Sequence, residues 1–271
     1  MPGPNEIKPN QLMKLIGTQE APLIFDLCLK EDYALDPRRV PTARRASHDD
    51  LSEIVRLAGE KNVVVYCQKG RKISQGAAAL LRTKGLTAEV LEGGQQAWVN
   101  SDLPTVSMPD GSNTPSRWVT RHRPKIDRVA CPWLIRRFID PAAEFLFVPP
   151  SDVELVAEKF GATPFDIEGV EISHDGEMCS FDAILKSFQL QSGPLSKMAE
   201  VIRAADTNNL RGNDQAAGLS AICLGLSRLH KDDIAQMNQA FVVFDALYMW
   251  ARDATDEIHD WPATTKRGVT A

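Results

Sequence analysis

Residues 62–85 read NVVVYCQKGRKISQGAAALLRTKG, which places a short apolar strand, a loop and an amphipathic helix directly one after another. The run from Val63 to Tyr66 is typical of a central strand that is buried on both faces of a parallel sheet. Gly85 ends the helix that follows. Ligands of such sheets bind beyond the carboxyl ends of the strands, and Cys67 lies at such an end. The stretch therefore predicts an α/β domain with a site at Cys67.

Apolar runs and amphipathic stretches alternate on both sides of this segment. We expect strands at 21–28, 62–67 and 88–94, and helices at 7–16, 49–59, 73–85 and 95–102. Strands that alternate with helices predict a parallel sheet covered by helices on both faces.

The composition changes at residues 103–115, which read LPTVSMPDGSNTP and have little to bury. Such a stretch is typical of a linker. Beyond it, helical patterns predominate, and the only strong β pattern is at 143–149. We expect helices at 131–139, 151–161, 180–190, 195–206, 216–229 and 232–258. The predicted organisation is an α/β domain at 1–106, a linker at 107–116, a mainly α-helical domain at 117–262 and a tail at 263–271.

Size and charge agree with two soluble domains. A chain of 271 residues can bury two cores of ordinary size. Of its 31 basic and 36 acidic side chains, 14 and 13 lie in residues 1–108, so the acidic excess belongs to the second part. This balance disfavours broad nucleic-acid binding. No export signal and no membrane-spanning apolar run is evident, so we expect a cytoplasmic protein that does not associate with membranes.

The cysteines indicate free thiols rather than a disulfide framework, because they are odd in number and widely scattered. They are Cys28, Cys67, Cys131, Cys179 and Cys223.

The loop after Cys67 provides three sources of positive potential, which a thiol needs if it is to react as a thiolate. A helix that begins near Ile73 or Ser74 presents unpaired N–H groups there. Three cations, Lys69, Arg71 and Lys72, lie in the loop, and Gly70 allows successive amides to face one point. The alternative is a buried, inert thiol.

The segment Cys67-Gln68-Lys69-Gly70-Arg71-Lys72, followed by the helix start Ser74-Gln75-Gly76, resembles the six-residue active loop of single-domain rhodaneses. Asp26 at the end of IFDLC and the segment LEGGQQAWVNSDLP at 91–104 resemble two further signatures of that family. The likeness covers about residues 5–105. It implies a rhodanese-like parallel sheet flanked by helices.

The resemblance implies sulfur transfer without a cofactor. The Cys67 thiolate would take a sulfane sulfur from a small-molecule donor such as thiosulfate and pass it to a thiol or cyanide-like acceptor. Residues Gln68, Lys69, Gly70, Arg71 and Lys72 would form the substrate-binding loop, supported by Asp26 and Ser74.

Two positions depart from the family pattern. Lys72 stands where many members have Arg, so a point charge replaces bidentate recognition of an oxyanion. Cys28 replaces the Arg of the family's Asp-Val-Arg, and it is either a small core residue or a resolving partner for Cys67.

Residues 117–137 concentrate positive charge. They contain Arg117, Arg121, Arg123, Lys125, Arg128, Arg136 and Arg137, with Asp127 as the only acidic residue. If a helix begins near Cys131-Pro132, these cations converge and can bind an oxyanion such as sulfate, chromate or phosphate. We expect Arg121, His122, Arg128 and Arg136 to form that site. The alternative is a solvated face whose arginine stems pack on apolar surface.

This second part resembles the carboxy-terminal domain of the chromate-resistance family typified by ChrB, over about residues 117–252. The likeness is carried by Thr120-Arg121, Asp127-Arg128, 133–140, 173–181 and 244–248. It implies a role in the response to chromate, as sensor or regulator.

A turn-rich segment of the second domain groups three types of metal ligand. His174, Glu177 and Cys179 are close in sequence, and Asp206 or Asp182 completes a predicted transition-metal site. The alternative is a hydrogen-bonded turn at His174 with Cys179 in the core.

Three functions fit these patterns. The first is a working sulfurtransferase whose second domain binds an acceptor, an oxyanion or a metal. The second is a chromate, oxyanion or redox sensor with a ligand-binding rhodanese domain. The third is an oxyanion- or metal-handling enzyme centred on the helical domain. We favour the first, because no DNA-recognition motif is evident. The apolar run 239–250, QAFVVFDALYMW, is either core or the contact of a homo-oligomer.

Overall fold

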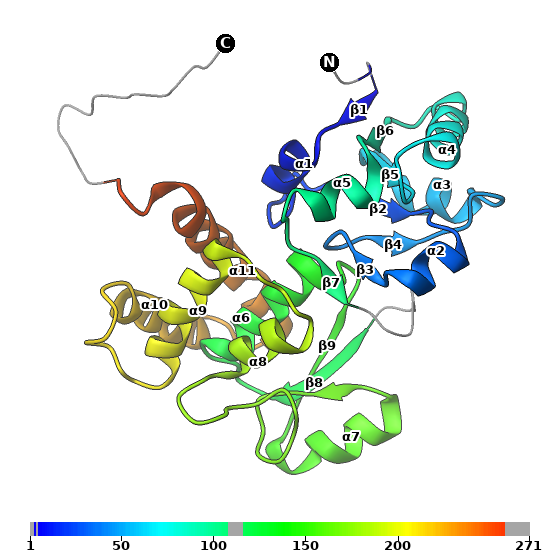
Figure 1. Cartoon of the computed structure of the whole chain (residues 1–271). Coiled ribbons are helices and arrows are strands. Elements are labelled where there is room, and N and C mark those ends of the chain that lie inside the picture. Colours follow the sequence, from blue (N-terminus) through cyan, green and yellow to red (C-terminus); the bar gives the residue numbers. More distant parts are fainter. Residues whose placement is uncertain (1–2, 4, 108–115, 258–271) are drawn as a thin grey trace.

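The computed structural model describes residues 3, 5–107 and 116–257 (Figure 1). Most of the predicted linker at 107–116 and all of the predicted tail at 263–271 lie outside these residues. Residues 258–262, which were assigned to the helical domain, lie outside them as well.

The first domain contains a parallel sheet of five strands in the order β1-β6-β5-β2-β4. The strands are β1 (Glu6–Ile7), β2 (Leu23–Asp26), β4 (Arg44–Arg45), β5 (Val63–Tyr66) and β6 (Ala88–Leu91). Strand β5 lies at the centre, as its continuous apolar run predicts. The carboxyl end of β5 therefore opens onto the middle of one sheet edge, and Cys67 follows it there.

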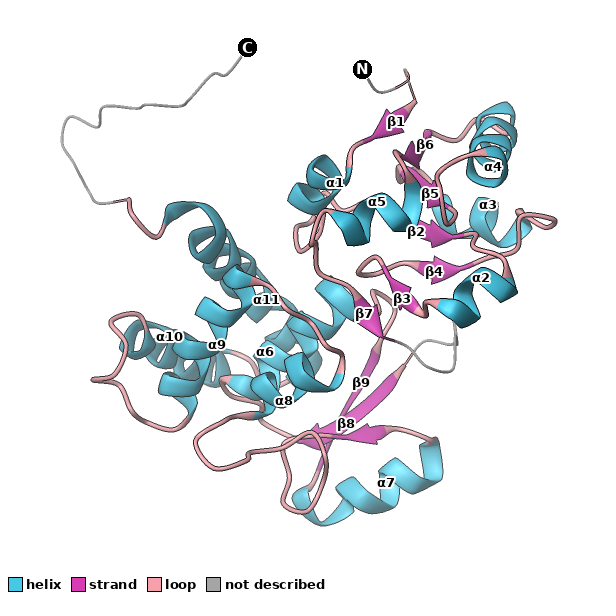
Figure 2. Ribbon diagram, in the orientation of Figure 1, coloured by secondary structure: helices cyan, strands magenta, loops and turns pink. Residues whose placement is uncertain are grey.

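Helices cover both faces of this sheet (Figures 1 and 2). They are α1 (Pro9–Leu15), α2 (Lys30–Leu35), α3 (Ser52–Ala58), α4 (Lys72–Thr83) and α5 (Gly94–Asn100). Alternate residues of β5 face opposite sides. Val63 and Val65 pack in one core with residues of α3 and α4, whereas Val64 and Tyr66 belong to the core that includes α1 and α5. The predicted fold class of this domain is confirmed.

The sequence patterns did not predict the short elements of the first domain. Strands β1 and β4 have two residues each, and α2 has six. A separate antiparallel pair joins β3 (Arg38–Arg39) to β7 (Val106–Ser107). Segments this short have no measurable periodicity, and their structure is decided by the distant strand that pairs with them.

The second domain is mainly helical, as predicted, and its helices lie close to the expected positions. They are α6 (Asp127–Leu134), α7 (Val153–Phe160), α8 (Ser180–Ser187), α9 (Gly193–Asp206), α10 (Ala216–Leu229) and α11 (Asp233–Met249). Short turns extend three of them: a π-helical turn at Ile135–Ile139 after α6, a 3₁₀ turn at Pro150–Asp152 before α7, and a π-helical turn at Trp250–Ala254 after α11.

A small parallel sheet accompanies these helices. It consists of β8 (Arg117–Arg121), β9 (Glu144–Val148) and β10 (Thr163–Pro164) in the order β10-β8-β9. Of these strands, only β9 was predicted. Val119 of β8 packs with Val153 of α7 on one face of the sheet, whereas Trp118 belongs to the main core. Successive residues of β8 therefore face opposite sides of the sheet: one side packs on α7, and the other packs on the main helical core.

The structure corrects the expected start of the first helix in this domain. Helix α6 begins at Asp127, four residues before Cys131, so Pro132 lies inside the helix rather than in its first turn. Ile126, with a φ of +42°, makes the sharp change of direction into the helix. As a consequence, Asp127 occupies the first turn of a helix that is buried in the domain.

One apolar core joins the two domains. It includes Leu12 and Ile16 of the first domain together with Phe138 and Tyr248 of the second. A side chain at Gly17 would collide with both of these aromatic rings, so this glycine allows the close approach. The backbone amide of Thr42 also donates to the Phe138 carbonyl at 3.0 Å.

The apolar run 239–250 contributes mostly to this core. Phe241, Phe244 and Tyr248 are buried, whereas Val242 is 60% exposed. Among the described residues, we find no helix with the length and apolarity needed to cross a membrane.

Candidate functional site

The loop after β5 surrounds the Cys67 sulfur with hydrogen-bond donors. Gly70 adopts a φ of +63°, which turns the chain back before α4 begins at Lys72. Ser74 Oγ lies 3.3 Å from Cys67 Sγ. The backbone amides of Ser74, Arg71 and Lys69 donate to the same sulfur. Three amides and a hydroxyl form a cradle that suits an anionic sulfur.

This environment lowers the pKa of the Cys67 thiol below its ordinary value. Burial acts in the opposite direction, because the sulfur is largely removed from water. The hydrogen bonds from Ser74 and from the two loop amides outweigh the effect of burial. The thiolate is therefore favoured by backbone geometry and one hydroxyl, rather than by direct contact with a cationic side chain.

The three cationic side chains of the loop point to solvent and do not contact the Cys67 sulfur. The side chains of Lys69, Arg71 and Lys72 are exposed, whereas Cys67 itself is only 6% exposed. Gln68 is half-buried, and its carbonyl accepts a hydrogen bond from the Gln96 amide at 3.0 Å. The three loop cations therefore place positive charge on the surface close to the buried Cys67 sulfur.

A pair of glycines at the start of α5, Gly93 and Gly94, allows this helix to approach the Cys67 loop closely. The Gln95 amide donates to the Cys67 carbonyl at 3.1 Å. A side chain at Gly94, where φ is +62°, would collide with the Cys67 carbonyl and the Gly70 amide. The sequence analysis quoted this glycine pair as a family signature but did not assign it this role. Two adjacent glycines before a helix are a signal of close backbone approach.

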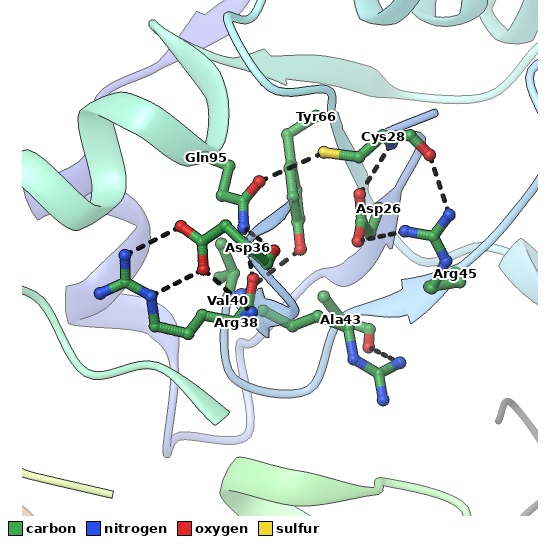
Figure 3. A network of polar contacts seen from close by, with 10 residues as sticks. Asp26, Cys28, Asp36, Arg38, Val40, Ala43, Arg45, Tyr66 and Gln95 are labelled. Atoms are coloured by element: carbon green, nitrogen blue, oxygen red, sulfur yellow. Dashed lines mark hydrogen bonds and ion pairs between the residues drawn. The ribbon is translucent and has the colours of Figure 1, made fainter. Parts of the chain in front are cut away.

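Asp26 supports the neighbouring turn rather than the Cys67 loop. Its carboxylate is fully buried and accepts hydrogen bonds from the Cys28 amide at 2.8 Å and from Arg45 at 3.1 Å (Figure 3). Arg45 also donates to the Cys28 carbonyl at 2.9 Å. Asp26 of β2 is the register partner of Tyr66 of β5, the residue before Cys67. Its influence on the Cys67 loop is therefore indirect, through the pairing of these two strands.

Cys28 has the properties of a core residue, the first of the two predicted alternatives. Burial and the nearby Asp26 carboxylate raise the pKa of its thiol. The thiol lies 3.5 Å from Gln95 Oε1, and Gln95 Nε2 donates to the carbonyls of Asp36 and Arg38 (Figure 3). A neutral thiol in this network is a poor nucleophile.

The structure does not bring the four predicted anion-binding residues together. Arg121 and Arg128 both lie against Asp166, at 2.8 and 3.0 Å. Arg136 donates instead to the Ala143 carbonyl, at 3.0 and 3.1 Å, and His122 is exposed. The predicted convergence of these four residues is wrong, because Asp166, distant in sequence, binds Arg121 and Arg128, whereas a nearby backbone carbonyl binds Arg136.

The predicted metal residues separate into two groups. His174 and Asp206 meet, with His174 Nε2 3.1 Å from Asp206 Oδ2, and Asp127 and Asp166 lie beside them. Glu177 is exposed. Cys179 is buried and caps the start of α8 through a reciprocal contact with Asp182. The prediction is therefore wrong for Glu177 and Cys179.

Asp182 is not part of this cluster either. Its carboxylate forms a bidentate ion pair with Arg203, at 2.8 and 3.0 Å.

The cluster of three carboxylates and one imidazole has perturbed acid–base properties. Contact with Asp127, together with the charges of Asp206 and Asp166, raises the pKa of His174 to about 9. Burial and the charges of Asp127 and Asp166 raise the pKa of Asp206 to about 7. Burial and the charge of Asp127 also raise the pKa of Asp166, although Arg121 and Arg128 oppose the effect. These shifts indicate an excess of buried negative charge.

Comparison with known proteins assigns both domains. Residues 8–101 match the rhodanese-like domain family. Residues 118–251 match the family described as ChrB, C-terminal domain. The chain joins a rhodanese-like domain to a ChrB C-terminal domain.

Individual relatives resemble one domain each. Protein ChrB of Cupriavidus metallidurans is 35% identical over 133 residues, which are 49% of this chain and 40% of that protein. The chain thus spans well under half the length of the curated relative that it matches.

Two solved structures resemble the rhodanese-like domain. A rhodanese-related protein of Thermoplasma volcanium is 21% identical, with a TM-score of 0.34, over 38% of this chain and 99% of its own. A thiosulfate sulfurtransferase of Pseudomonas aeruginosa is 24% identical, with a TM-score of 0.33, over 39% of this chain and 20% of its own.

Two acidic residues of the ChrB C-terminal domain were not predicted as site residues. Asp127 was noted as the single acidic residue of the basic stretch 117–137 and in a family likeness, and Asp166 was not singled out. Both are buried, and they come from the start of α6 and from the segment after β10. The available signal was that Asp127 stands two residues before the apolar stretch VACPWLI at 129–135, where an ionisable side chain is seldom buried without a specific role.

Proposed function

We propose that the chain is a sulfurtransferase in which Cys67 carries the sulfur as a persulfide. The observation that supports this most directly is the cradle around Cys67 Sγ, with amides of Lys69, Arg71 and Ser74 and the Ser74 hydroxyl, which lowers the pKa of the thiol. A thiolate at neutral pH is the form required for attack on a sulfane sulfur.

The first half-reaction uses a donor such as thiosulfate. The Cys67 thiolate attacks the outer sulfur, a new S–S bond forms, and the bond between the two sulfurs of thiosulfate breaks. Sulfite leaves with the electron pair of that bond. The resulting persulfide is an anion at neutral pH, so the same amides stabilise it.

The second half-reaction returns the enzyme to its starting state. A nucleophilic acceptor, such as cyanide or a thiolate, attacks the terminal sulfur of the persulfide. The S–S bond to Cys67 breaks, and the Cys67 thiolate leaves with the electron pair. Neither half-reaction requires a metal or an organic cofactor.

The exposed loop cations have a role in attracting the donor. Lys69, Arg71 and Lys72 surround a buried sulfur, so an anionic donor meets a positive surface before it reaches the nucleophile. Because Lys72 provides a point charge instead of a guanidinium fork, we expect weaker discrimination among anionic donors.

The likeness of the second domain to ChrB links this sulfur chemistry to the chromate response. It also supports a second candidate function, in which the rhodanese-like domain binds a ligand or reports oxidants and the protein acts as a sensor. The low exposure of Cys67, at 6%, is the observation that favours this second function.

A thiocyanate assay distinguishes the two functions. We expect the purified full chain to form thiocyanate from thiosulfate and cyanide, the Cys67→Ala variant to form none above background, and the buried control Cys223→Ala to retain activity. If the native protein shows no turnover with several sulfur donors although Cys67 remains alkylatable, the sensor function is correct instead.

A further inference from the structure

Three metal-ligating side chains of the ChrB C-terminal domain meet outside the sulfurtransferase site. Asp127 lies at the start of α6, His174 in the loop before α8, and Asp206 at the end of α9. One ligand atom from each lies within 4.8 Å of the other two. Residues separated by up to 79 positions are therefore brought to one point by three different elements of the fold.

The spacing of these atoms matches the edges of a coordination shell. His174 Nε2 lies 3.1 Å from Asp206 Oδ2 and 3.4 Å from Asp127 Oδ2. Ligand atoms at about 2.1 Å from one divalent ion, at tetrahedral or octahedral angles, are separated by roughly 3.0–3.4 Å. Two edges of the site therefore have the length that one ion requires, and the carboxylate oxygens of Asp127 and Asp206 lie within 4.8 Å of each other.

A buried carboxylate oxygen without a hydrogen-bond donor points independently to a cation ligand. Asp127 is 1% exposed, and its Oδ2 accepts no hydrogen bond from any described residue, although it is directed at His174. An orphaned carboxylate oxygen in the protein interior is costly unless a cation or a donor compensates it.

The neighbouring guanidinium groups do not provide this compensation. Arg121 and Arg128 both form their ion pairs with Asp166. Among the described residues, Asp127 and Asp206 form ion-pair contacts with His174 only. Two carboxylates and one imidazole are a common ligand set for zinc and for other first-row metals.

We propose that Asp127, His174 and Asp206 bind one divalent transition-metal ion. Asp166, held by the two arginines, lies beside the site but outside the ligand set. His174 has a side chain that is 39% exposed, so the ion reaches the site from solvent and retains a coordination position for water or for an anionic ligand. The imidazole selects for zinc or cobalt over magnesium.

Titration of the full chain with Zn²⁺ and Co²⁺ tests this site. The protein is purified without an affinity metal, treated with a chelator and dialysed, and binding is measured by calorimetry in the Cys67→Ala background, which removes the reactive thiolate. We expect one equivalent of either ion per chain and no competition by Mg²⁺. The Co²⁺ spectrum should show weak visible bands without an intense thiolate charge-transfer band, because the ligands are oxygen and nitrogen.

Matched variants separate this site from adventitious binding. We expect Asp127→Asn and His174→Ala to weaken Zn²⁺ binding by about 100-fold, and the exposed carboxylate variant Glu177→Gln to bind as the parent does. If Asp127→Asn does not fold, His174→Ala decides, because that side chain is partly exposed. The proposal is overturned if Zn²⁺ and Co²⁺ show no saturable binding, if both ligand variants bind as tightly as the parent, or if Co²⁺ gives a thiolate band.

Discussion

Three backbone amides donate to the Cys67 sulfur and the Ser74 hydroxyl lies 3.3 Å from it, whereas desolvation by burial determines the pKa of the other four cysteines. Burial raises the pKa of Cys28, Cys131 and Cys179, and it raises the pKa of Cys223 to about 11. The five thiols of this chain should therefore differ widely in reactivity.

Alkylation as a function of pH measures this difference. Since the pKa of Cys67 is lowered, its thiolate fraction and its reaction rate with iodoacetamide should reach half their maximum at a pH below the ordinary pKa of a thiol. Mass spectrometry at pH 7 should find a single adduct, at Cys67. Comparable labelling of Cys223, or a Cys67 profile centred above pH 9, would contradict the assignment of the thiolate.

Ser74→Ala tests the contribution of the only side chain in the cradle. Loss of a hydroxyl donor 3.3 Å from the sulfur destabilises the thiolate relative to the thiol. A hydrogen bond to a charged group contributes about 1.5–3 kcal/mol, so we expect the pKa of Cys67 to rise by about 1–2 units. The exposed Ser101→Ala is the control. An unchanged profile in Ser74→Ala would show that the amides suffice.

The segment of β5, loop and α4 is the part of the site that the sequence predicts best, because its information is local. Here an apolar strand, a glycine and a helix start follow one another along the chain. Together they determine how the backbone amides around the Cys67 sulfur are oriented. The support from Gly94 and Gln95 is harder to predict, because it depends on a contact between segments about 27 residues apart.

Gly94→Ala tests whether the close contact between the start of α5 and the Cys67 loop holds that loop in place. A Cβ at Gly94 would collide with the Cys67 carbonyl and displace the active loop. We expect a loss of stability of at least about 2 kcal/mol and a large fall in the alkylation rate of Cys67.

Gly85→Ala is the matched control for that variant. Gly85 also has a positive φ, +83°, but a Cβ there meets nothing within 4 Å. Only the backbone strain remains, which costs about 1 kcal/mol. The role assigned to Gly94 fails if the two variants have equal effects in urea unfolding and in Cys67 labelling.

The second domain shows why buried polar clusters resist prediction from one sequence. His174 and Asp206 were predicted together with Glu177 and Cys179, which were included because they lie near His174 in the sequence. The actual neighbours, Asp127 and Asp166, come from other elements. The strands β8 and β10 were missed for the same reason, since their pairing joins distant segments.

At the scale of the whole molecule, the shared core predicts that the two domains stabilise each other. Leu12 and Ile16 of the rhodanese-like domain pack in one cluster with aromatic residues of the ChrB C-terminal domain. Unfolding of one domain would expose the apolar surface of the other, so we expect a single cooperative transition.

Phe138→Ala tests this coupling. Phe138 is fully buried beside Gly17, and its truncation should cost about 3–5 kcal/mol. Because the core is shared, the buried Cys28 of the other domain should become reactive at a lower urea concentration. Phe160→Ala, at a 55% exposed position, is the control. Protection of Cys28 that is unchanged in Phe138→Ala would show that the domains unfold independently.

Intact-mass spectrometry after incubation with thiosulfate tests the central claim most directly. The wild-type chain should gain the mass of one sulfur atom per chain, release one equivalent of sulfite and lose the added sulfur on treatment with cyanide. The Cys67→Ala variant should show none of these changes. A wild-type chain that gains no sulfur while Cys67 remains folded and alkylatable, or a sulfur adduct that persists in Cys67→Ala, would contradict the proposed function.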